Sequence, residues 1–276
     1  MNYTGYKFWQ LNEEEMADWY SGNLLAPTDL NVNEYLIIQD SDGVMVDKYC
    51  LRKDGLKKVL YSCIKNSYCG IIKPRNIYQE LAINMLQTRE APIKIFRGTY
   101  GCGKDYLMSA EAISQIEQGN FNKLVYVRPN VGLANVPDIG YLKGGIDEKL
   151  GWTLAPLWDK FGGEEVVKEM QEQGIIELVP LPFIRGRSFE NAIIYVSEGQ
   201  NITKETAAVI ISRLGENSEL WINGDCHQTD KRVYDDNNGI TAMINTLTND
   251  PLFQMVHSPI TERSQAARLA AKLMGE

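Results

Sequence analysis

The sequence predicts an α/β protein, with a parallel sheet covered by helices on both faces and a small β-rich element ahead of it. Two observations lead to this fold class. From residue 74 onward, short apolar runs alternate with segments whose apolar spacing is that of helices. Before residue 74, apolar positions alternate over shorter stretches, as they do in half-buried strands. Alternating strands and helices are typical of right-handed βαβ crossovers, which build parallel sheets.

Residues 1–73 are expected to form an acidic N-terminal segment and the small β-rich element. Apolar runs at 34–40 and 44–51 flank Ser41, Asp42 and Gly43, which are residue types that favour a hairpin turn. Residues 1–30 mix acidic and aromatic side chains without a long period. A compact decoration that binds no ligand is the alternative to a functional role for this segment.

Residues 74–276 are expected to form the main domain. The predicted strands are residues 93–96, 124–127, 175–179, 193–196, 220–223 and 253–256, and the predicted helices include residues 104–117, 164–173 and 204–214. Ligands of such sheets bind at the carboxyl ends of the strands. We therefore expect a ligand site at that edge of the sheet.

The composition limits the classes of protein that fit the chain. Its 276 residues are 44% hydrophobic, but no uncharged apolar run reaches the roughly 18 residues of a membrane span. The N-terminus lacks a signal pattern, so a cytoplasmic protein is expected, or one of the host cytoplasm if the source is a bacteriophage. Five cysteines without a CxxC pair, beside two histidines, argue against zinc. The net charge of −8 argues against a nonspecific nucleic-acid coat, while a local basic channel is still compatible with it.

The loop after the strand at 93–96 carries the most specific motif. Gly98 and Gly103 stand five apart, Lys104 follows, and a helical segment begins, which is the setting of a phosphate-binding P-loop. Glycines let backbone N–H groups turn toward one anion, and Lys104 would reach the β- and γ-phosphates. An ordinary glycine-rich turn is the alternative. The residues expected to bind the nucleotide here are Gly98, Thr99, Tyr100, Gly101, Cys102, Gly103, Lys104, Asp105 and Tyr106.

Two positions depart from the usual pattern of such sites. Asp105 replaces the Ser or Thr whose hydroxyl would hold Mg²⁺, and Ser197 replaces an acid that would hold the same metal. We hypothesise a reciprocal exchange in which Asp105 and Ser197 together bind Mg²⁺. Glu198, after the strand at 193–196, would polarise an attacking water. The alternatives are a strand that merely ends in an acid, and a decayed site that binds nucleotide without hydrolysing it.

Three further residues could complete the site. Gln228, in a Gly-Asp-x-x-Gln pattern after a strand, could sense the γ-phosphate, although Gly-Asp is also ordinary turn chemistry. Gln79, on a helix ahead of the loop, could hydrogen-bond the adenine edge, or be a solvated helix residue. Arg263, at the start of the last helix, could complete a neighbouring subunit's site as an arginine finger, or pair with a local acid.

Two basic clusters could contact phosphates of ATP or of a nucleic-acid backbone. Arg128 follows the strand at 124–127, and Arg185 and Arg187 precede the strand at 193–196. Guanidinium groups form paired hydrogen bonds with phosphate oxygens. Surface arginines without a ligand are the alternative.

Taken together, these motifs resemble the PhoH-like ATPases, whose core is similar to that of superfamily 1 helicases. The order and spacing match across residues 74–270. The matching segments are residues 74–79, 98–104, 127–129, 140–144, 183–187, 198–201, 213–215 and 224–228. Where the family reads Gly-Lys-Thr and Asp-Glu-Ala-Gln, this chain has Gly-Lys-Asp and Ser-Glu-Gly-Gln. The departures bear on hydrolysis more than on nucleotide binding.

The resemblance implies binding of ATP and Mg²⁺, ring-shaped oligomers such as a hexamer, and action on RNA or single-stranded nucleic acid. Some members couple RNA unwinding to a PIN nuclease domain, but the first 70 residues are too short for one. We therefore expect a Mg²⁺-dependent ATPase. The rival interpretations are a nucleotide-binding ring or scaffold without turnover, and, less favoured, a nucleotide kinase.

Overall fold

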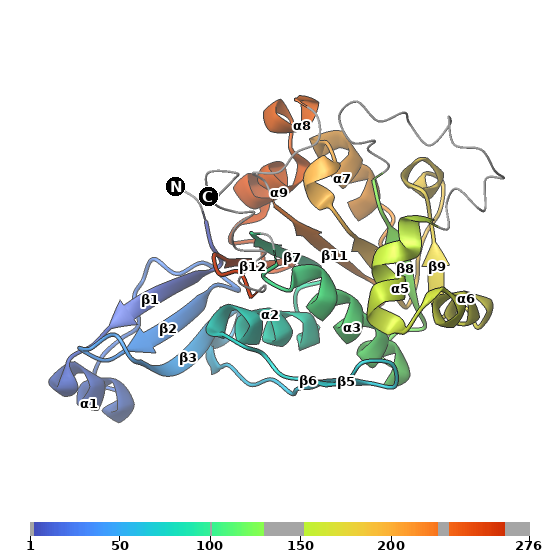
Figure 1. Ribbon diagram of the computed structural model, residues 1–276. Coiled ribbons are helices and arrows are strands. Elements are labelled where there is room, and N and C mark those ends of the chain that lie inside the picture. The colour runs from blue at the N-terminus through green and yellow to red at the C-terminus, as the bar shows by residue number, and fades with distance from the viewer. Residues whose placement is uncertain (1–2, 100, 130–151, 226–231, 263–276) are drawn as a thin grey trace.

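The computed structural model describes residues 3–99, 101–129, 152–225 and 232–262, and a six-stranded parallel sheet forms its centre (Figure 1). The strand order is β12-β7-β11-β10-β8-β9, and all the pairings are parallel. The strands are β7 (Ile93–Gly98), β8 (Lys123–Val127), β9 (Ile176–Leu178), β10 (Ala192–Val196), β11 (Glu219–Gly224) and β12 (Phe253–Ser258). All six predicted strands are confirmed, and so is the parallel α/β fold class.

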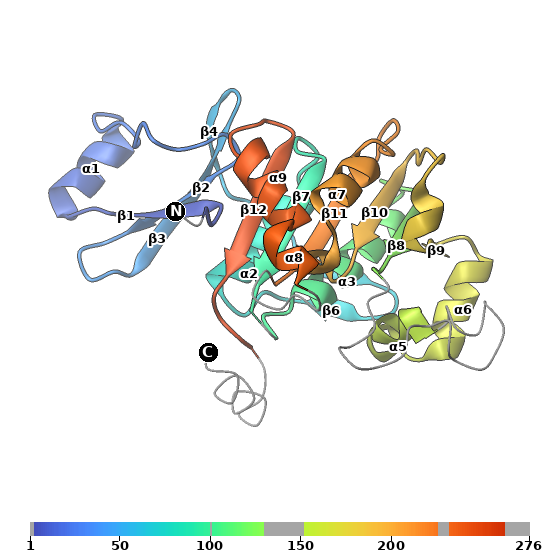
Figure 2. The same cartoon turned by 90° about the horizontal axis from the view of Figure 1, so that it is seen from above.

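Helices cover both faces of this sheet, because alternate strand residues enter two separate cores. Phe96 and Tyr195 pack with α2, α3, α5 and α6, whereas Ile95 and Ile194 pack with α7 and α9 (Figure 2). The helices are α2 (Ile77–Gln87), α3 (Lys104–Glu117), α5 (Ala155–Phe161), α6 (Glu164–Glu172), α7 (Lys204–Ile211), α8 (Val233–Asp236) and α9 (Gly239–Leu247). Short 3₁₀ turns are η2 (Trp152–Leu154), η3 (Leu181–Ile184) and η4 (Gly199–Asn201).

A smaller four-stranded sheet lies beside β12, at the edge of the main sheet (Figure 2). It contains β1 (Tyr6–Gln10), β2 (Tyr35–Gln39), β3 (Met45–Arg52) and β4 (Gly55–Lys58), in that order, and the predicted hairpin is its β2–β3 pair. The Asn33 amide joins the two sheets by donating to the carbonyl oxygens of Pro251 (2.9 Å) and Phe253 (3.0 Å). The division of the chain at residue 73 stays a prediction.

The first thirty residues, which show no long sequence period, form β1 and the helix α1 (Glu13–Ser21). Asn12 accepts a hydrogen bond from the Glu15 N–H, and the Glu15 carboxylate accepts one from the Asn12 N–H, which is a capping box. This local signal marks the start of α1. A separate hairpin, β5 (Ile64–Asn66) with β6 (Gly70–Ile72), packs along α3. No helix in the described part of the chain is long and apolar enough to cross a membrane.

Glu111, on the buried side of α3, generates a prediction about pH. Burial raises the pKa of its carboxyl to about 7, although hydrogen bonds from Gln115 and Gln87 and the charge of Lys94 oppose the shift. Between the ordinary carboxyl pKa and pH 7, the folded chain therefore holds a proton here that the unfolded chain has released. The contribution of Glu111 to the free energy of unfolding then falls as pH rises, by up to about 3 kcal/mol.

Replacing Glu111 with Gln should remove this fall, so the stability of the variant relative to the wild type should rise between about pH 5 and about pH 8. Urea unfolding at several pH values measures the difference. The exposed Glu165→Gln serves as the control for the loss of a surface carboxylate. A stability difference that does not change with pH for Glu111→Gln would contradict the assignment.

Candidate phosphate-binding site

The loop between β7 and α3 has the backbone that the phosphate-binding motif requires. Gly101 and Gly103 adopt left-handed conformations, with φ of 69° and 88°. A Cβ at Gly98 would lie 2.7 Å from the Ser258 carbonyl oxygen and 2.8 Å from the Cys102 sulfur. Glycine is therefore needed at Gly98 for space, and at Gly101 and Gly103 for conformation.

Polar groups of the loop are arranged to receive an anion. The Lys104 ammonium donates to the carbonyl oxygens of Gly98 (2.9 Å) and Thr99 (3.1 Å), which holds it over the loop. The buried Thr99 hydroxyl has no hydrogen-bond partner among the described residues. The loop leads into the N-terminus of the 14-residue helix α3, whose free N–H groups favour negative charge. These features fit the phosphates of a nucleotide.

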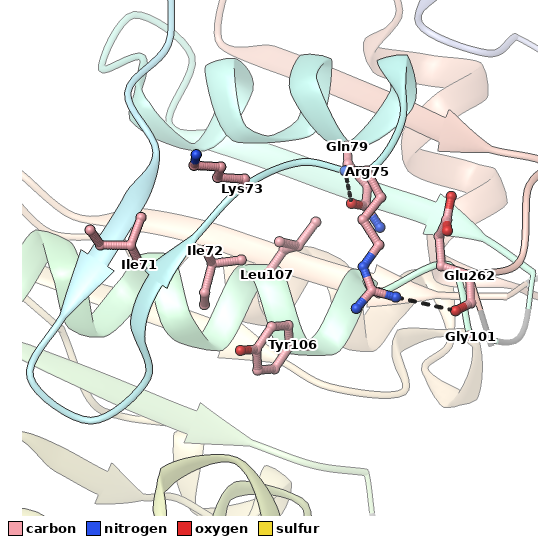
Figure 3. A pocket seen from close by; sticks show the side chains of 10 residues that line it. Ile71, Ile72, Lys73, Arg75, Gln79, Gly101, Tyr106, Leu107 and Glu262 are labelled. Carbon is pink, nitrogen blue, oxygen red and sulfur yellow. Dashed lines mark hydrogen bonds between the residues drawn. The ribbon is translucent and has the colours of Figure 1, made fainter. Parts of the chain in front are cut away.

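A cavity of about 340 Å³ lies beside this loop, between α2, α3 and the β5–β6 hairpin (Figure 3). Four of its lining residues were expected to bind nucleotide, namely Gln79 from α2, Tyr106 from α3, and Gly101 and Gly103 from the loop. The other lining residues were not assigned to a site from the sequence, although Arg75 belongs to the motif that precedes α2. The lining residues are Ile71, Ile72, Lys73, Arg75, Gln79, Gly101, Gly103, Tyr106, Leu107 and Glu262.

Gln79 connects the start of α2 to the phosphate loop. Its amide oxygen accepts from the Arg75 N–H (2.8 Å), and its amide nitrogen donates to the Cys102 carbonyl oxygen (3.0 Å). Both ends of the side chain thus contact backbone, and the side chain also lines the cavity. The reading of adenine by Gln79 stays a prediction, and the structure adds a role in positioning the loop.

Asp105, in the first turn of α3, is the centre of a polar cluster at the carboxyl ends of the strands. Its Oδ1 accepts hydrogen bonds from the Tyr195 hydroxyl, from the Ser197 hydroxyl (3.2 Å) and from the Asn223 amide (3.0 Å). Its Oδ2 forms an ion pair with the Lys160 ammonium, which comes from α5. Sequence reasoning found Asp105 and Ser197 but not Tyr195, Asn223 or Lys160, which carry no motif.

The charge of Asp105 is maintained by these contacts. Burial by itself raises the pKa of the carboxyl, but the Lys160 ammonium, the Tyr195 hydroxyl and the charge of Arg128 outweigh it and hold the pKa below its usual value. Burial and the Asp105 charge raise the pKa of Tyr195 well above its ordinary value, so its hydroxyl stays protonated and donates.

The predicted metal pair, Asp105 and Ser197, lies side by side, but its surroundings do not suit Mg²⁺. A magnesium ion needs oxygen ligands that face an open position. Both oxygens of Asp105 are already occupied by donors or by an ammonium group, and Ser197 itself donates to Asp105. With these contacts in place, Asp105 and Ser197 offer no open position that fits Mg²⁺. The assignment of Mg²⁺ to this pair stays a prediction.

Glu198 lies at the end of β10, one residue beyond Ser197. Its backbone is left-handed, with φ of 58°, and the Asn223 amide oxygen accepts from its N–H (2.8 Å). The Gln200 amide donates to its carboxylate (2.7 Å). A non-glycine residue held in this conformation is typical of a functional site. Asn223 therefore joins the Glu198 backbone to the Asp105 carboxylate.

The three predicted phosphate-contacting arginines have different surroundings. Arg128 follows β8, at the same edge of the sheet as Asp105. Burial raises the pKa of the Asp105 carboxyl, and the charge of Arg128 adds to the larger effect of Lys160 in lowering it. Arg187 is engaged by Glu177 (2.6 Å) and stacks 4.5 Å above the Phe189 ring. Arg185 is exposed beside a second cavity of about 290 Å³. Tyr100, Gln228, Arg263 and the segment 140–144 lie outside the described residues.

Gln79 offers a test of the coupling between α2 and the loop. Gln79→Ala leaves the Arg75 N–H and the Cys102 carbonyl without their partner, so the free energy of unfolding should fall by about 1–3 kcal/mol. ATP should also bind more weakly, by about tenfold, in equilibrium titrations. The exposed Gln173→Ala is the matched control and should change neither quantity. Wild-type values for Gln79→Ala would contradict the positioning role.

Comparison of the sequence with known proteins shows the family of the chain. The sequence profile of the family described as PhoH-like protein matches residues 71–271. Protein PhoH2 of Bacillus subtilis (strain 168) is 29% identical over 289 residues, with 99% of this chain and 64% of the relative covered. Protein PhoH2 of Thermobispora bispora is 28% identical (74% and 47% covered), and Protein PhoH of Escherichia coli (strain K12) is 32% identical (55% and 44%). The chain spans less than two thirds of the length of each of these relatives. Because the family profile matches more than half of the chain, the chain belongs to the PhoH family.

Proposed function

We propose that this protein binds ATP at the loop 98–104 and hydrolyses it, acting as an oligomer on RNA or single-stranded nucleic acid. The observation that carries the proposal is the phosphate loop itself, with the Lys104 ammonium held above it and a cavity for the base beside it. The family membership supports the same function. The cavity lies against Gln79 and Tyr106, as expected of a base site next to the loop.

The residues divide the work of hydrolysis in the following way. Lys104 and the N–H groups of Gly101, Cys102 and Gly103 hold the phosphates. Water attacks the γ-phosphorus, the bond from that phosphorus to the β,γ-bridging oxygen breaks, and Glu198 orients the water and accepts its proton. The Gln200 amide positions the Glu198 carboxylate for this step. No step uses a residue that would have to bind Mg²⁺.

Several parts of the proposal rest on the sequence resemblance. Gln228 would sense the γ-phosphate, and Arg263 would enter a neighbouring subunit's site in a ring, for which a hexamer is expected. Contact with nucleic acid is assigned first to Arg185, because its side chain is exposed, whereas Arg187 is already engaged by Glu177 and Phe189. Arg128 lies closer to the ATP site and is assigned to its phosphates.

A second function, nucleotide binding without turnover, is favoured by one observation. Asp105 stands where the metal-binding hydroxyl of a P-loop is expected, and Lys160 occupies one of its oxygens. A ring that uses ATP as a structural ligand would tolerate this change. The nucleotide kinase considered from the sequence is supported by no observation on the described residues.

Phosphate release from ATP, measured with and without single-stranded RNA, tests the proposal. Lys104→Ala removes the ammonium at the loop and Glu198→Gln removes the base, so each should slow release by about 10²-fold or more. Glu198→Gln should still bind ATP. Arg185→Ala should lower the stimulation by RNA without changing release in its absence.

The exposed Glu165→Gln controls for the loss of a carboxylate and should release phosphate at the wild-type rate. Release by Glu198→Gln at the wild-type rate would remove Glu198 from the chemistry. ATP binding by the wild type without any release would favour the second function. No ATP binding at all would overturn both.

A further inference from the structure

Lys160 is a charged side chain at this site that the proposed chemistry does not use. It lies in α5, in the connection between β8 and β9, and reaches Asp105 from 55 residues away in the sequence. Only 13% of its side chain is exposed. Its ammonium has no other side-chain or backbone acceptor among the described residues. One of its three N–H bonds thus has an acceptor among these residues, the Asp105 carboxylate.

A role in stability alone explains this pair poorly. Ion pairs removed from water gain little net free energy, because desolvation of both charges offsets their attraction. A hydroxyl at position 105 would leave no charge to compensate. Asp105 instead adds a negative charge next to a loop built for phosphates, where it repels ATP unless a cation accompanies it. Lys160 is that cation, and it brings a hydrogen-bond donor as well as a charge.

The surroundings fix this cation in place. Tyr195, Ser197 and Asn223 all donate to the opposite oxygen of Asp105, so the carboxylate is held from the ends of β10 and β11. The Lys160 ammonium binds the remaining oxygen. Three donors thus hold Oδ1 of the carboxylate, and Oδ2 faces a single cation. That cation is supplied by the protein itself, as the Lys160 ammonium.

We propose that the Lys160 ammonium, held on Asp105, takes the place of Mg²⁺ as the positive charge beside the bound phosphates, so that ATP binds without a divalent metal. This inference rests on the proposed binding of ATP at the loop 98–104. Lysine acts on phosphate as a point charge, which is what this position requires. The residues at positions 105 and 197, which depart from the usual motif, then accompany the replacement of a metal ion by the Lys160 ammonium.

Equilibrium binding of ATP in Mg²⁺ and in EDTA tests the inference. The wild-type Kd should differ by less than about threefold between the two buffers, whereas Lys160→Met should weaken binding in EDTA by about tenfold or more. Lys160→Arg keeps the charge and should retain binding in EDTA within about threefold of the wild type. Lys168→Met removes an exposed lysine that pairs with Glu164 on α6, and it should bind like the wild type.

Lys160→Met leaves Asp105 without its cation and could misfold, so a double variant is needed. Asp105→Asn combined with Lys160→Met removes both charges of the pair, and its thermal unfolding reports on folding. If the ammonium itself contacts the phosphates, this folded double variant should also bind ATP about tenfold more weakly in EDTA. Wild-type affinity of the double variant would overturn the inference, since Lys160 would then serve only to neutralise Asp105.

Two other outcomes separate this inference from the proposed function. ATP binding by the wild type in Mg²⁺ but not in EDTA would overturn the role of Lys160 and leave the proposed ATP site intact. Tighter binding by Lys160→Met in EDTA would also overturn it, because the ammonium would then block the site. Absence of ATP binding in both buffers would overturn the proposed function itself.

Discussion

The hydrogen-bonded carboxylate of Asp105 is the interaction on which the whole site depends. Asp105 lies in the first turn of α3, directly after the phosphate loop, and its carboxylate is contacted from β10 by Tyr195, from β11 by Asn223 and from α5 by Lys160. Negative charge in the first turn of a helix is favoured by the helix dipole. Two strands and one helix are thus fixed relative to the loop through one side chain.

This arrangement couples the proposed catalytic base to the phosphate loop. Asn223 donates to Asp105 and accepts from the Glu198 N–H, so the proposed base and the phosphate loop share one bridging amide. Such buried polar networks contribute little net stability, but they specify one geometry when every member has a partner. We therefore infer that the charged pair at the end of this loop serves function rather than stability.

The fold was predictable from the sequence because strands buried on both faces appear as continuous apolar runs, as at 193–196, and because glycines mark the loop at 98–103. The polar cluster around Asp105 was not predictable in this way. Tyr195 lies inside an apolar run and resembles a core residue, and Lys160 resembles a solvated lysine on a short helix. Their meeting at Asp105 depends on tertiary packing across 90 and 55 residues, which no local pattern encodes. The strand β1 was missed because its partner β2 lies more than twenty residues further along the chain.

A crystal structure of the protein with a non-hydrolysable ATP analogue, grown in Mn²⁺, would test the exchange of metal for ammonium most directly. Anomalous scattering locates manganese independently of the protein. We expect the analogue in the loop 98–104, the Lys160 ammonium beside its phosphates, and no anomalous peak between Asp105 and Ser197. A manganese peak bound by Asp105, with Lys160 turned away from it, would contradict the role given to the lysine.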